Sequence, residues 1–209
     1  MIVKICGIKK IETLLCCENN GVNFFGMVFY SKSPRNININ QAIELQSKSK
    51  ILNINGVGVF VNENLDNLKK LVKVLNLKYV QLHGSEDNEY INQINKLNVK
   101  IIKKISIKDK KDLEELKNFQ EVDYYLFDYK GSKNELPGGN SKTFDWKIIE
   151  NLKLNKPWFL SGGINIENIS LIKTNIKPYA VDLSSGAEKK LGIKDNQIIN
   201  NLMENIHNA

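Results

Sequence analysis

Short apolar runs alternate with segments of helical periodicity along the whole chain, with one strand–helix pair in about 26 residues. The runs rich in Val, Ile and Phe are predicted to be strands, at Ile2–Ile8, Phe24–Phe29, Val57–Val61, Tyr79–His83, Lys100–Ile105, Tyr124–Asp128, Trp158–Ser161 and Ala180–Leu183. The segments between and after them are predicted to be helices, at Ile11–Asn20, Gln41–Lys48, Leu65–Leu75, Asn88–Leu97, Lys111–Phe119, Trp146–Leu152, Glu167–Thr174 and Gln197–Ile206. The pattern indicates an α/β protein.

Nearly continuous apolar strands separated by helices are typical of a parallel sheet that helices cover. Eight such units in 209 residues is the number at which a parallel sheet closes into a barrel. A doubly wound open sheet is the alternative, but no GxGxxG follows the first strand and fewer strands would be expected at this length. Composition does not shift along the chain, so we expect one (β/α)₈ barrel domain over residues 1–209.

The formal net charge of +7 raises the question of a nucleic-acid or membrane partner. The Lys residues are interspersed with Glu and Asp, which favours a solvated surface and neither of those partners. With no basic leader and no long apolar stretch, we expect a cytoplasmic protein whose three cysteines are reduced thiols. Among 30 basic residues only Arg35 is an arginine, so this position calls for a geometric reason.

In a parallel barrel the active site lies where the strands end, so polar residues at these ends are the candidates. They are Cys6, Arg35, His83, Asp128, the Gly162–Gly163 pair, Asp182, Ser184 and Ser185.

Two of these residues are candidates for proton transfer. Cys6 lies beside Gly7, and the positive field expected near a phosphate site would favour its thiolate; otherwise it is a small buried apolar residue. Asp128 ends an apolar strand, where burial disfavours the charged carboxylate and would let it act as an acid. Asp128 could equally anchor a loop. His83 could contact the substrate, position the acid or be a satisfied polar residue at the barrel rim.

The remaining candidates suit the binding of anions. Loops with Gly162–Gly163 and Ser184–Ser185 follow two neighbouring strands, and glycine lets backbone amides approach a phosphate closely. A tight turn with Asn165 as a helix cap would explain one loop, but the two together favour phosphate binding. The guanidinium of Arg35 could hold a carboxylate with two hydrogen bonds and stack on an aromatic ring, whereas a surface arginine would do neither.

Six segments stand out along the chain: Lys4-Ile5-Cys6-Gly7-Ile8, Val57-Gly58-Val59-Phe60-Val61-Asn62, Val80-Gln81-Leu82-His83-Gly84, Lys142-Thr143-Phe144-Asp145-Trp146, Ser161-Gly162-Gly163 and Val181-Asp182-Leu183-Ser184-Ser185-Gly186. In this order, from residue 3 to about residue 195, they resemble phosphoribosylanthranilate isomerases of tryptophan biosynthesis.

The resemblance implies an Amadori rearrangement of N-(5-phosphoribosyl)anthranilate, with no metal and no organic cofactor. It implies that Asp128 protonates the furanose oxygen and that Cys6 removes the proton from carbon 2. Arg35 would contact the anthranilate part, and the last two loops would hold the phosphate. We expect His83 and Asp182 to contact this small phosphorylated substrate, and the protein to be a monomer or homodimer.

Three places depart from the family pattern: Lys9 where Thr or Ser is usual, Tyr129 where a small residue is usual, and Gly138-Gly139-Asn140-Ser141 in place of a more glycine-rich run. The departures put closure of the loop after the sixth strand and substrate affinity in question.

Three other functions fit the sequence less well. The related histidine-pathway isomerase would be expected to have two Asp residues and phosphate loops in both halves. Indole-glycerol-phosphate synthase would need a catalytic Lys and Glu and a longer N-terminal extension. The presence of both Cys6 and Asp128 argues against a non-catalytic phosphate-binding or nucleic-acid-binding module.

Overall fold

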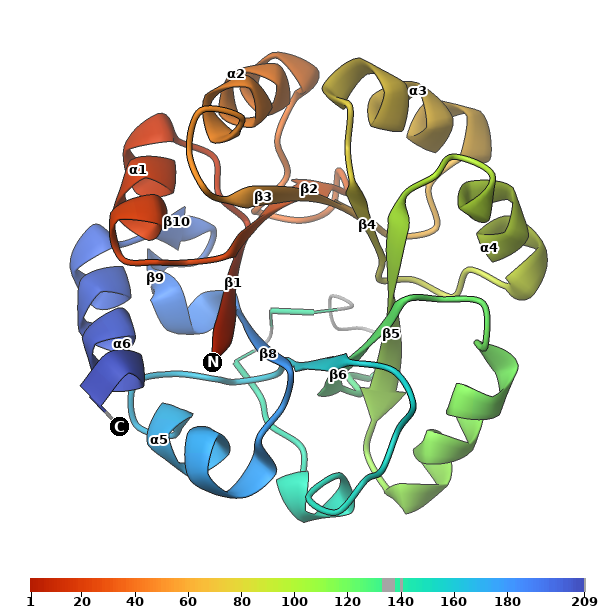
Figure 1. The fold of residues 1–209 in the computed structure, drawn as a ribbon, viewed down its shortest axis with the longest axis vertical. Coiled ribbons are helices and arrows are strands. Elements are labelled where there is room, and N and C mark those ends of the chain that lie inside the picture. Colours follow the sequence, from red (N-terminus) through yellow and green to blue (C-terminus); the bar gives the residue numbers. More distant parts are fainter. Residues whose placement is uncertain (133–137, 140, 209) are drawn as a thin grey trace.

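Eight parallel strands form a closed barrel in the computed structural model, which describes residues 1–132, 138–139 and 141–208. Each strand pairs with the next along the chain, and the eighth pairs with the first, as Figure 1 shows in a view into the barrel. The strands are β1 (Ile2–Cys6), β2 (Phe24–Phe29), β3 (Asn55–Phe60), β4 (Tyr79–Leu82), β5 (Lys100–Ile107), β6 (Tyr124–Tyr129), β7 (Trp158–Leu160) and β8 (Ala180–Leu183). The predicted (β/α)₈ barrel is confirmed.

Helices surround the barrel on its outer side (Figure 1). The α-helices are α1 (Ile11–Asn19), α2 (Ile39–Ser49), α3 (Leu65–Leu75), α4 (Asn88–Asn95), α5 (Ile169–Leu171) and α6 (Asn196–Asn208). The tighter or wider turns are the 3₁₀ segments η1 (Lys110–Asn118), η2 (Trp146–Ile148) and η4 (Ser185–Ala187), and the π segment η3 (Ile172–Ile176). Within the described residues, no helix is long and apolar enough to cross a membrane.

The second half of the barrel departs from the predicted regular helices. The segment predicted at 111–119 is a 3₁₀ helix over Lys110–Asn118, in which only Leu116 is buried, so little packing stabilises a wider α-helix. Of the helix predicted at 146–152 only the short η2 forms, and the helix predicted at 167–174 is one α-helical turn followed by π geometry.

A small antiparallel hairpin, β9 (Glu188–Lys190) and β10 (Ile193–Lys194), follows β8 and was not predicted. Its turn contains Gly192 at φ +77°, a backbone conformation that favours glycine.

Side chains alternate between the interior of the barrel and the layer under the helices. In β2, Phe24 and Val28 face inward, whereas Phe25 and Met27 pack in the outer core. The inward apolar cluster contains Cys6, Phe24, Val28, Val57, Val59, Ile102, Leu126, Phe159 and Ala180.

The two ends of the barrel interior differ in chemistry. Aromatic rings gather at the amino-terminal ends of the strands: Phe24 contacts Tyr79 and Phe159, and Tyr124 contacts Phe159 and Tyr179, with ring centroids 5.1–5.9 Å apart. Polar and ionisable side chains occupy the carboxyl ends. The functional site is therefore expected at the carboxyl ends.

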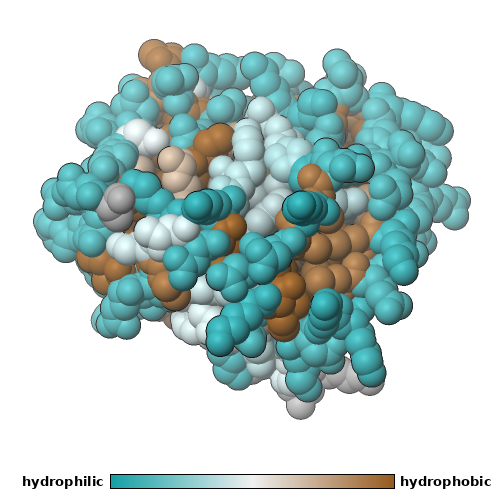
Figure 2. Space-filling model, turned by 60° about the horizontal axis from the view of Figure 1, so that its bottom comes forward, coloured by the Kyte–Doolittle hydropathy of each residue, from teal (hydrophilic) through white to brown (hydrophobic). Residues whose placement is uncertain are grey.

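The outer surface is largely hydrophilic, with scattered apolar residues on the face that Figure 2 shows. This is the surface that interspersed lysine and carboxylate side chains produce.

Candidate active site

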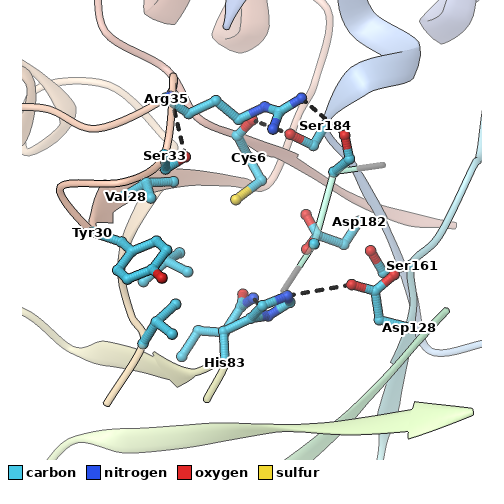
Figure 3. A pocket seen from close by; sticks show the side chains of 15 residues that line it. Cys6, Val28, Tyr30, Ser33, Arg35, His83, Asp128, Ser161, Asp182 and Ser184 are labelled. Carbon is cyan, nitrogen blue, oxygen red and sulfur yellow. Dashed lines mark hydrogen bonds and ion pairs between the residues drawn. The ribbon is translucent and has the colours of Figure 1, made fainter. Parts of the chain in front are cut away.

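A pocket lies at the carboxyl ends of the strands and brings together six of the predicted site residues. They are Cys6, Arg35, His83, Asp128, Asp182 and Ser184, which come from separate strands or loops (Figure 3). Gly162, Gly163 and Ser185 do not line this pocket. The prediction that these polar side chains meet at one end of the barrel is thus met for the six.

Cys6 ends β1, and its thiol points into the pocket (Figure 3). The neighbouring strand makes room for it, because a Cβ atom at Gly26 would lie 2.7 Å from the sulfur. Burial raises the pKa of the Cys6 thiol, while the cations of Lys4 and Lys194 act to lower it. Two lysines thus place positive charge near this thiol, but in this structure burial outweighs it.

An ion pair lies beside Cys6 inside the barrel. The Nζ atom of Lys4 is 2.8 Å from Oδ1 of Asp182, and both side chains are almost fully buried. Burial acts to lower the pKa of Lys4, but the carboxylate of Asp182 and the thiol of Cys6 outweigh it and raise that pKa. Burial raises the pKa of Asp182, and Lys4 opposes this shift. Asp182 therefore balances the charge of the lysine next to the thiol.

Asp128 lies across the pocket from Cys6, near the end of β6 (Figure 3). Its Oδ2 atom is 3.3 Å from Nε2 of His83, and its Oδ1 accepts a hydrogen bond of 2.9 Å from the Tyr129 amide. Burial and the charge of Lys104 lower the pKa of His83, so its ring is neutral at pH 7. The amide Nε2 of Gln81 lies 2.8 Å from His83 Nδ1, which assigns the ring proton to Nε2, facing Asp128.

Arg35, in the loop after β2, is buried and held by a carboxylate that sequence reasoning did not find. Its Nε and Nη2 atoms donate to the two oxygens of Glu188 at 2.8 and 2.9 Å. Nη2 also donates to the carbonyl of Gly139 at 3.3 Å, and the hydroxyl of Ser33 accepts from the Arg35 amide. The two-bond grip expected of this arginine is made to Glu188 in this structure.

One wall of the pocket is apolar. Val28, Tyr30, Val59 and Val61 from the second and third strands and their loops line it. Arg35 lines the same pocket, so the wall offers an aromatic ring a surface near a guanidinium.

The two loops predicted to bind phosphate meet beside the pocket. Gly162 and Gly163 both have positive φ, and a Cβ atom at Gly186 would lie 2.0 Å from the carbonyl oxygen of Ile164. The amides of Gly163, Ser185 and Gly186 donate no hydrogen bond to any residue of the described chain. Ser184 instead donates its hydroxyl to the Cys6 carbonyl at 3.2 Å.

Gly138 and Gly139 pack over the polar residues of the pocket. A Cβ atom at Gly138 would lie 2.5 Å from His83 Nε2, and one at Gly139 would lie 2.3 Å from Arg35 Nη1. A larger residue at either place would displace these groups. Among the described residues, no cluster of His, Cys, Asp or Glu side chains could hold a metal ion.

Comparison with known proteins decides the family. A family model described as N-(5'-phosphoribosyl)anthranilate (PRA) isomerase matches residues 3–205. The N-(5'-phosphoribosyl)anthranilate isomerase of Thermoanaerobacter pseudethanolicus is 41% identical over 204 residues, which are 98% of this chain and 97% of that protein. The chain belongs to the PRA isomerase family.

Solved structures of PRA isomerases share the same barrel. The crystal structure of the phosphoribosyl anthranilate isomerase of Thermotoga maritima is similar with a TM-score of 0.88 at 34% identity, over 100% of both chains. A PRA isomerase in complex with reduced 1-(o-carboxyphenylamino)-1-deoxyribulose 5-phosphate is similar with a TM-score of 0.83 at 32% identity, again over 100% of both chains.

The departures from the PRA isomerase pattern have structural roles. Lys9 donates to the carbonyl of Pro34 at 3.0 Å and so ties the first loop to the loop of Arg35. The ring of Tyr129 lies 5.8 Å from the ammonium of Lys142, while its amide holds Asp128. Ser141 has a positive φ of 57°, and Asn140 lies outside the described residues.

The sequence did not single out several polar residues in or next to the pocket. Gln81, Tyr30, Ser33 and Ser161 line it, and Lys4, Glu188 and Lys194 pair with charged residues beside it. Lys4 and Gln81 each precede a predicted site residue by two positions on the same strand face, so the period of two was a usable signal. Glu188 and Lys194 lie on the unpredicted hairpin, and no pattern around them points to the pocket.

Proposed function

We propose that this chain converts N-(5'-phosphoribosyl)anthranilate to 1-(2-carboxyphenylamino)-1-deoxyribulose 5-phosphate by general acid–base catalysis. The observation that carries the proposal is that Cys6 and Asp128 face one pocket from opposite strands, with Arg35 at its edge. The reaction only moves protons and electron pairs within one molecule, so it needs one group that donates and one that accepts. Family membership supports the same reaction.

In the first step Asp128 acts as the general acid and gives a proton to the furanose ring oxygen. The bond between carbon 1 and that oxygen breaks, and the anthranilate nitrogen supplies the electron pair that forms a Schiff base. The neutral ring of His83 keeps the Asp128 carboxyl group oriented through the contact to Oδ2. Both side chains are buried, which strengthens the electrostatic contact between them.

In the second step the Cys6 thiolate removes the proton from carbon 2. The electron pair left there forms the bond between carbons 1 and 2 and returns the nitrogen to neutrality, giving an enolamine that tautomerises to the ketone. The ammonium of Lys4 stabilises the thiolate that this step requires, because its charge opposes the effect of burial.

The remaining parts of the pocket fit the rest of the substrate. The apolar wall suits the anthranilate ring, Arg35 suits its carboxylate, and Asp182 and His83 are polar contacts for the ribose portion. The phosphate would lie against the amides of Gly162, Gly163, Ser184 and Ser185, whose loops neighbour one another. The proposed reaction uses no cofactor and no metal, and we propose that the protein acts as a monomer or a homodimer in the cytoplasm.

Turnover of freshly generated N-(5'-phosphoribosyl)anthranilate, followed by loss of anthranilate fluorescence, tests the proposal. Cys6→Ser and Asp128→Asn should each lower kcat by about 100- to 10,000-fold while the far-UV spectrum and unfolding curve stay near those of the parent. Cys16→Ala is the matched control, because Cys16 lies on α1 away from the pocket and should leave kcat unchanged. No turnover by the parent, or near-normal kcat in either site variant, would contradict the proposal.

A further inference from the structure

Glu188 and Arg35 form a buried two-bond fork at the edge of the pocket. The two carboxylate oxygens of Glu188 accept from Nε and Nη2 of Arg35 at 2.8 and 2.9 Å, and both side chains are only 3% exposed. The Glu188 oxygens also accept from Lys194 and from the amide of Gly192. The fork to Glu188 uses the edge of the guanidinium that carries Nε and Nη2, so Nη1 lies outside it.

The contacts of Arg35 also fix the position of its two terminal nitrogens, Nη1 and Nη2. Nη2 uses its second hydrogen on the Gly139 carbonyl, and Nη1 donates to none of the described residues. Gly7 and Gly139 pack against Arg35, since Cβ atoms there would lie 2.9 Å from its Cδ and 2.3 Å from its Nη1. Arg35 is thereby held at the pocket that it lines, and Nη1 is the guanidinium nitrogen that makes no hydrogen bond within the described residues.

The hairpin that carries Glu188 is held on one side against the loop after β8 and on the other side against the loop of Arg35. Lys194 pairs with Glu188 across the hairpin and donates to the carbonyl of Ser184 at 3.1 Å. On the other side, a Cβ atom at Gly192 would lie 2.6 Å from the carbonyl oxygen of Pro34, next to Arg35. The carboxylate of Glu188 therefore has a fixed position relative to the Arg35 loop.

We propose that Glu188 is a positioning residue that holds Arg35 ready for the carboxylate of the anthranilate part of the substrate. The inference rests on the proposed function. A free arginine side chain must give up its rotamer freedom when it binds, whereas one already held by Glu188 does not. Held in this way, Arg35 keeps Nη1 for the substrate, while Glu188 itself does not touch the substrate.

A competing role for Glu188 predicts the opposite sign. If Glu188 were only a counter-ion, its negative charge would weaken the attraction of Arg35 for a second carboxylate, and its removal would lower KM. If Glu188 positions Arg35, its removal raises KM, because the guanidinium becomes free to turn. The direction of the change in KM separates the two roles.

The test is steady-state kinetics of Glu188→Gln, in which the amide group offers one acceptor and cannot hold both Nε and Nη2. We expect KM to rise roughly 5- to 30-fold, the equivalent of arginine rotamer freedom, with kcat within twofold of the parent. Inhibition by anthranilate, which carries the carboxylate, should weaken with KM, whereas inhibition by inorganic phosphate should not change. Glu204→Gln, an exposed substitution on α6, is the matched control and should behave like the parent.

Glu188→Asp keeps the charge but is one methylene shorter, so it covers the case in which Glu188→Gln does not fold. If Glu188 positions Arg35, KM of this variant should rise as well. If Glu188 is only a counter-ion, KM should not rise, because the charge is kept. An unchanged or lowered KM, or equal weakening of anthranilate and phosphate, overturns the inference while the parent still turns over its substrate. A parent without turnover overturns the proposed function and this inference together.

Discussion

Replacing Lys4 with Met tests the charge balance of the barrel interior. The substitution keeps an unbranched side chain of similar length but leaves the carboxylate of Asp182, 4% exposed, without its partner at 2.8 Å. Breaking a buried ion pair from one side typically destabilises a protein by about 3–5 kcal/mol. We therefore expect the free energy of unfolding of Lys4→Met to fall by that amount at pH 7.

The size of the loss should depend on pH. Without Lys4 the main opposition to burial is lost and the pKa of Asp182 rises further, so the folded variant tends to take up a proton that the unfolded chain does not hold. A group whose pKa is raised by folding stabilises the folded state below its unfolded pKa, and this contribution is lost as pH rises. Holding that proton costs at most ~1.4 kcal/mol per pH unit above an unfolded pKa of ~3.9, so the loss of stability should be larger at pH 7 than at pH 5.

Urea unfolding of the parent and Lys4→Met at pH 5, 6 and 7 measures this difference directly. Lys4→Met/Asp182→Asn, which removes both charges, should recover most of the stability and lose the pH dependence. Lys100→Met, at the exposed pair with Asp123, should leave the unfolding curve nearly unchanged. A difference between parent and Lys4→Met that is constant from pH 5 to pH 7 would refute the reasoning.

Three further predictions concern other parts of the site. Because burial lowers the pKa of His83 below its usual 6.5, stability should fall as pH drops below 6.5, and His83→Gln should show a shallower fall in urea unfolding; an identical pH profile would contradict this. Ser185→Asp should weaken inhibition by inorganic phosphate because the new carboxylate repels the anion, whereas Ser185→Asn, with an uncharged side chain of the same shape as Asp, should not. Equal phosphate affinity of the two variants would show that the phosphate does not bind beside Ser185. Arg35→Lys should lower kcat/KM by roughly 10- to 150-fold, since one ammonium cannot keep the fork to Glu188 and also reach a carboxylate. A kcat/KM within twofold of the parent would return Arg35 to a structural role.

The fold could be predicted because the barrel depends on a repeated pattern. Each strand buries both faces and so reads as an apolar run, and eight such runs with helical segments between them determine the topology. The irregular segments after β5, β6 and β7 could not be predicted in the same way. Their geometry depends on local caps such as Asp109 and Asp145, and on how little apolar surface each segment buries.

The site residues that lie at the carboxyl ends of strands could be predicted from the sequence. Cys6, His83, Asp128 and Asp182 end or nearly end strands, so the barrel frame alone brings them to one pocket. The partner of Arg35 could not be predicted, because Glu188 is 153 positions away and reaches it from a hairpin with no strong strand pattern. The effect of burial on Cys6 also needed coordinates, since it depends on the balance between desolvation and two lysines.

The aromatic cluster at the amino-terminal ends of the strands has a consequence for how this scaffold can change. In β6, Tyr124 at one end belongs to the aromatic cluster and Asp128, on the same face, belongs to the pocket, with Leu126 between them. One strand thus carries a residue that packs in the aromatic cluster, Tyr124, and a residue that lines the pocket, Asp128. Volume-conserving substitutions at the aromatic end should shift thermal stability with little effect on the reaction. The carboxyl ends of the strands can accept new polar groups while the aromatic end keeps its packing.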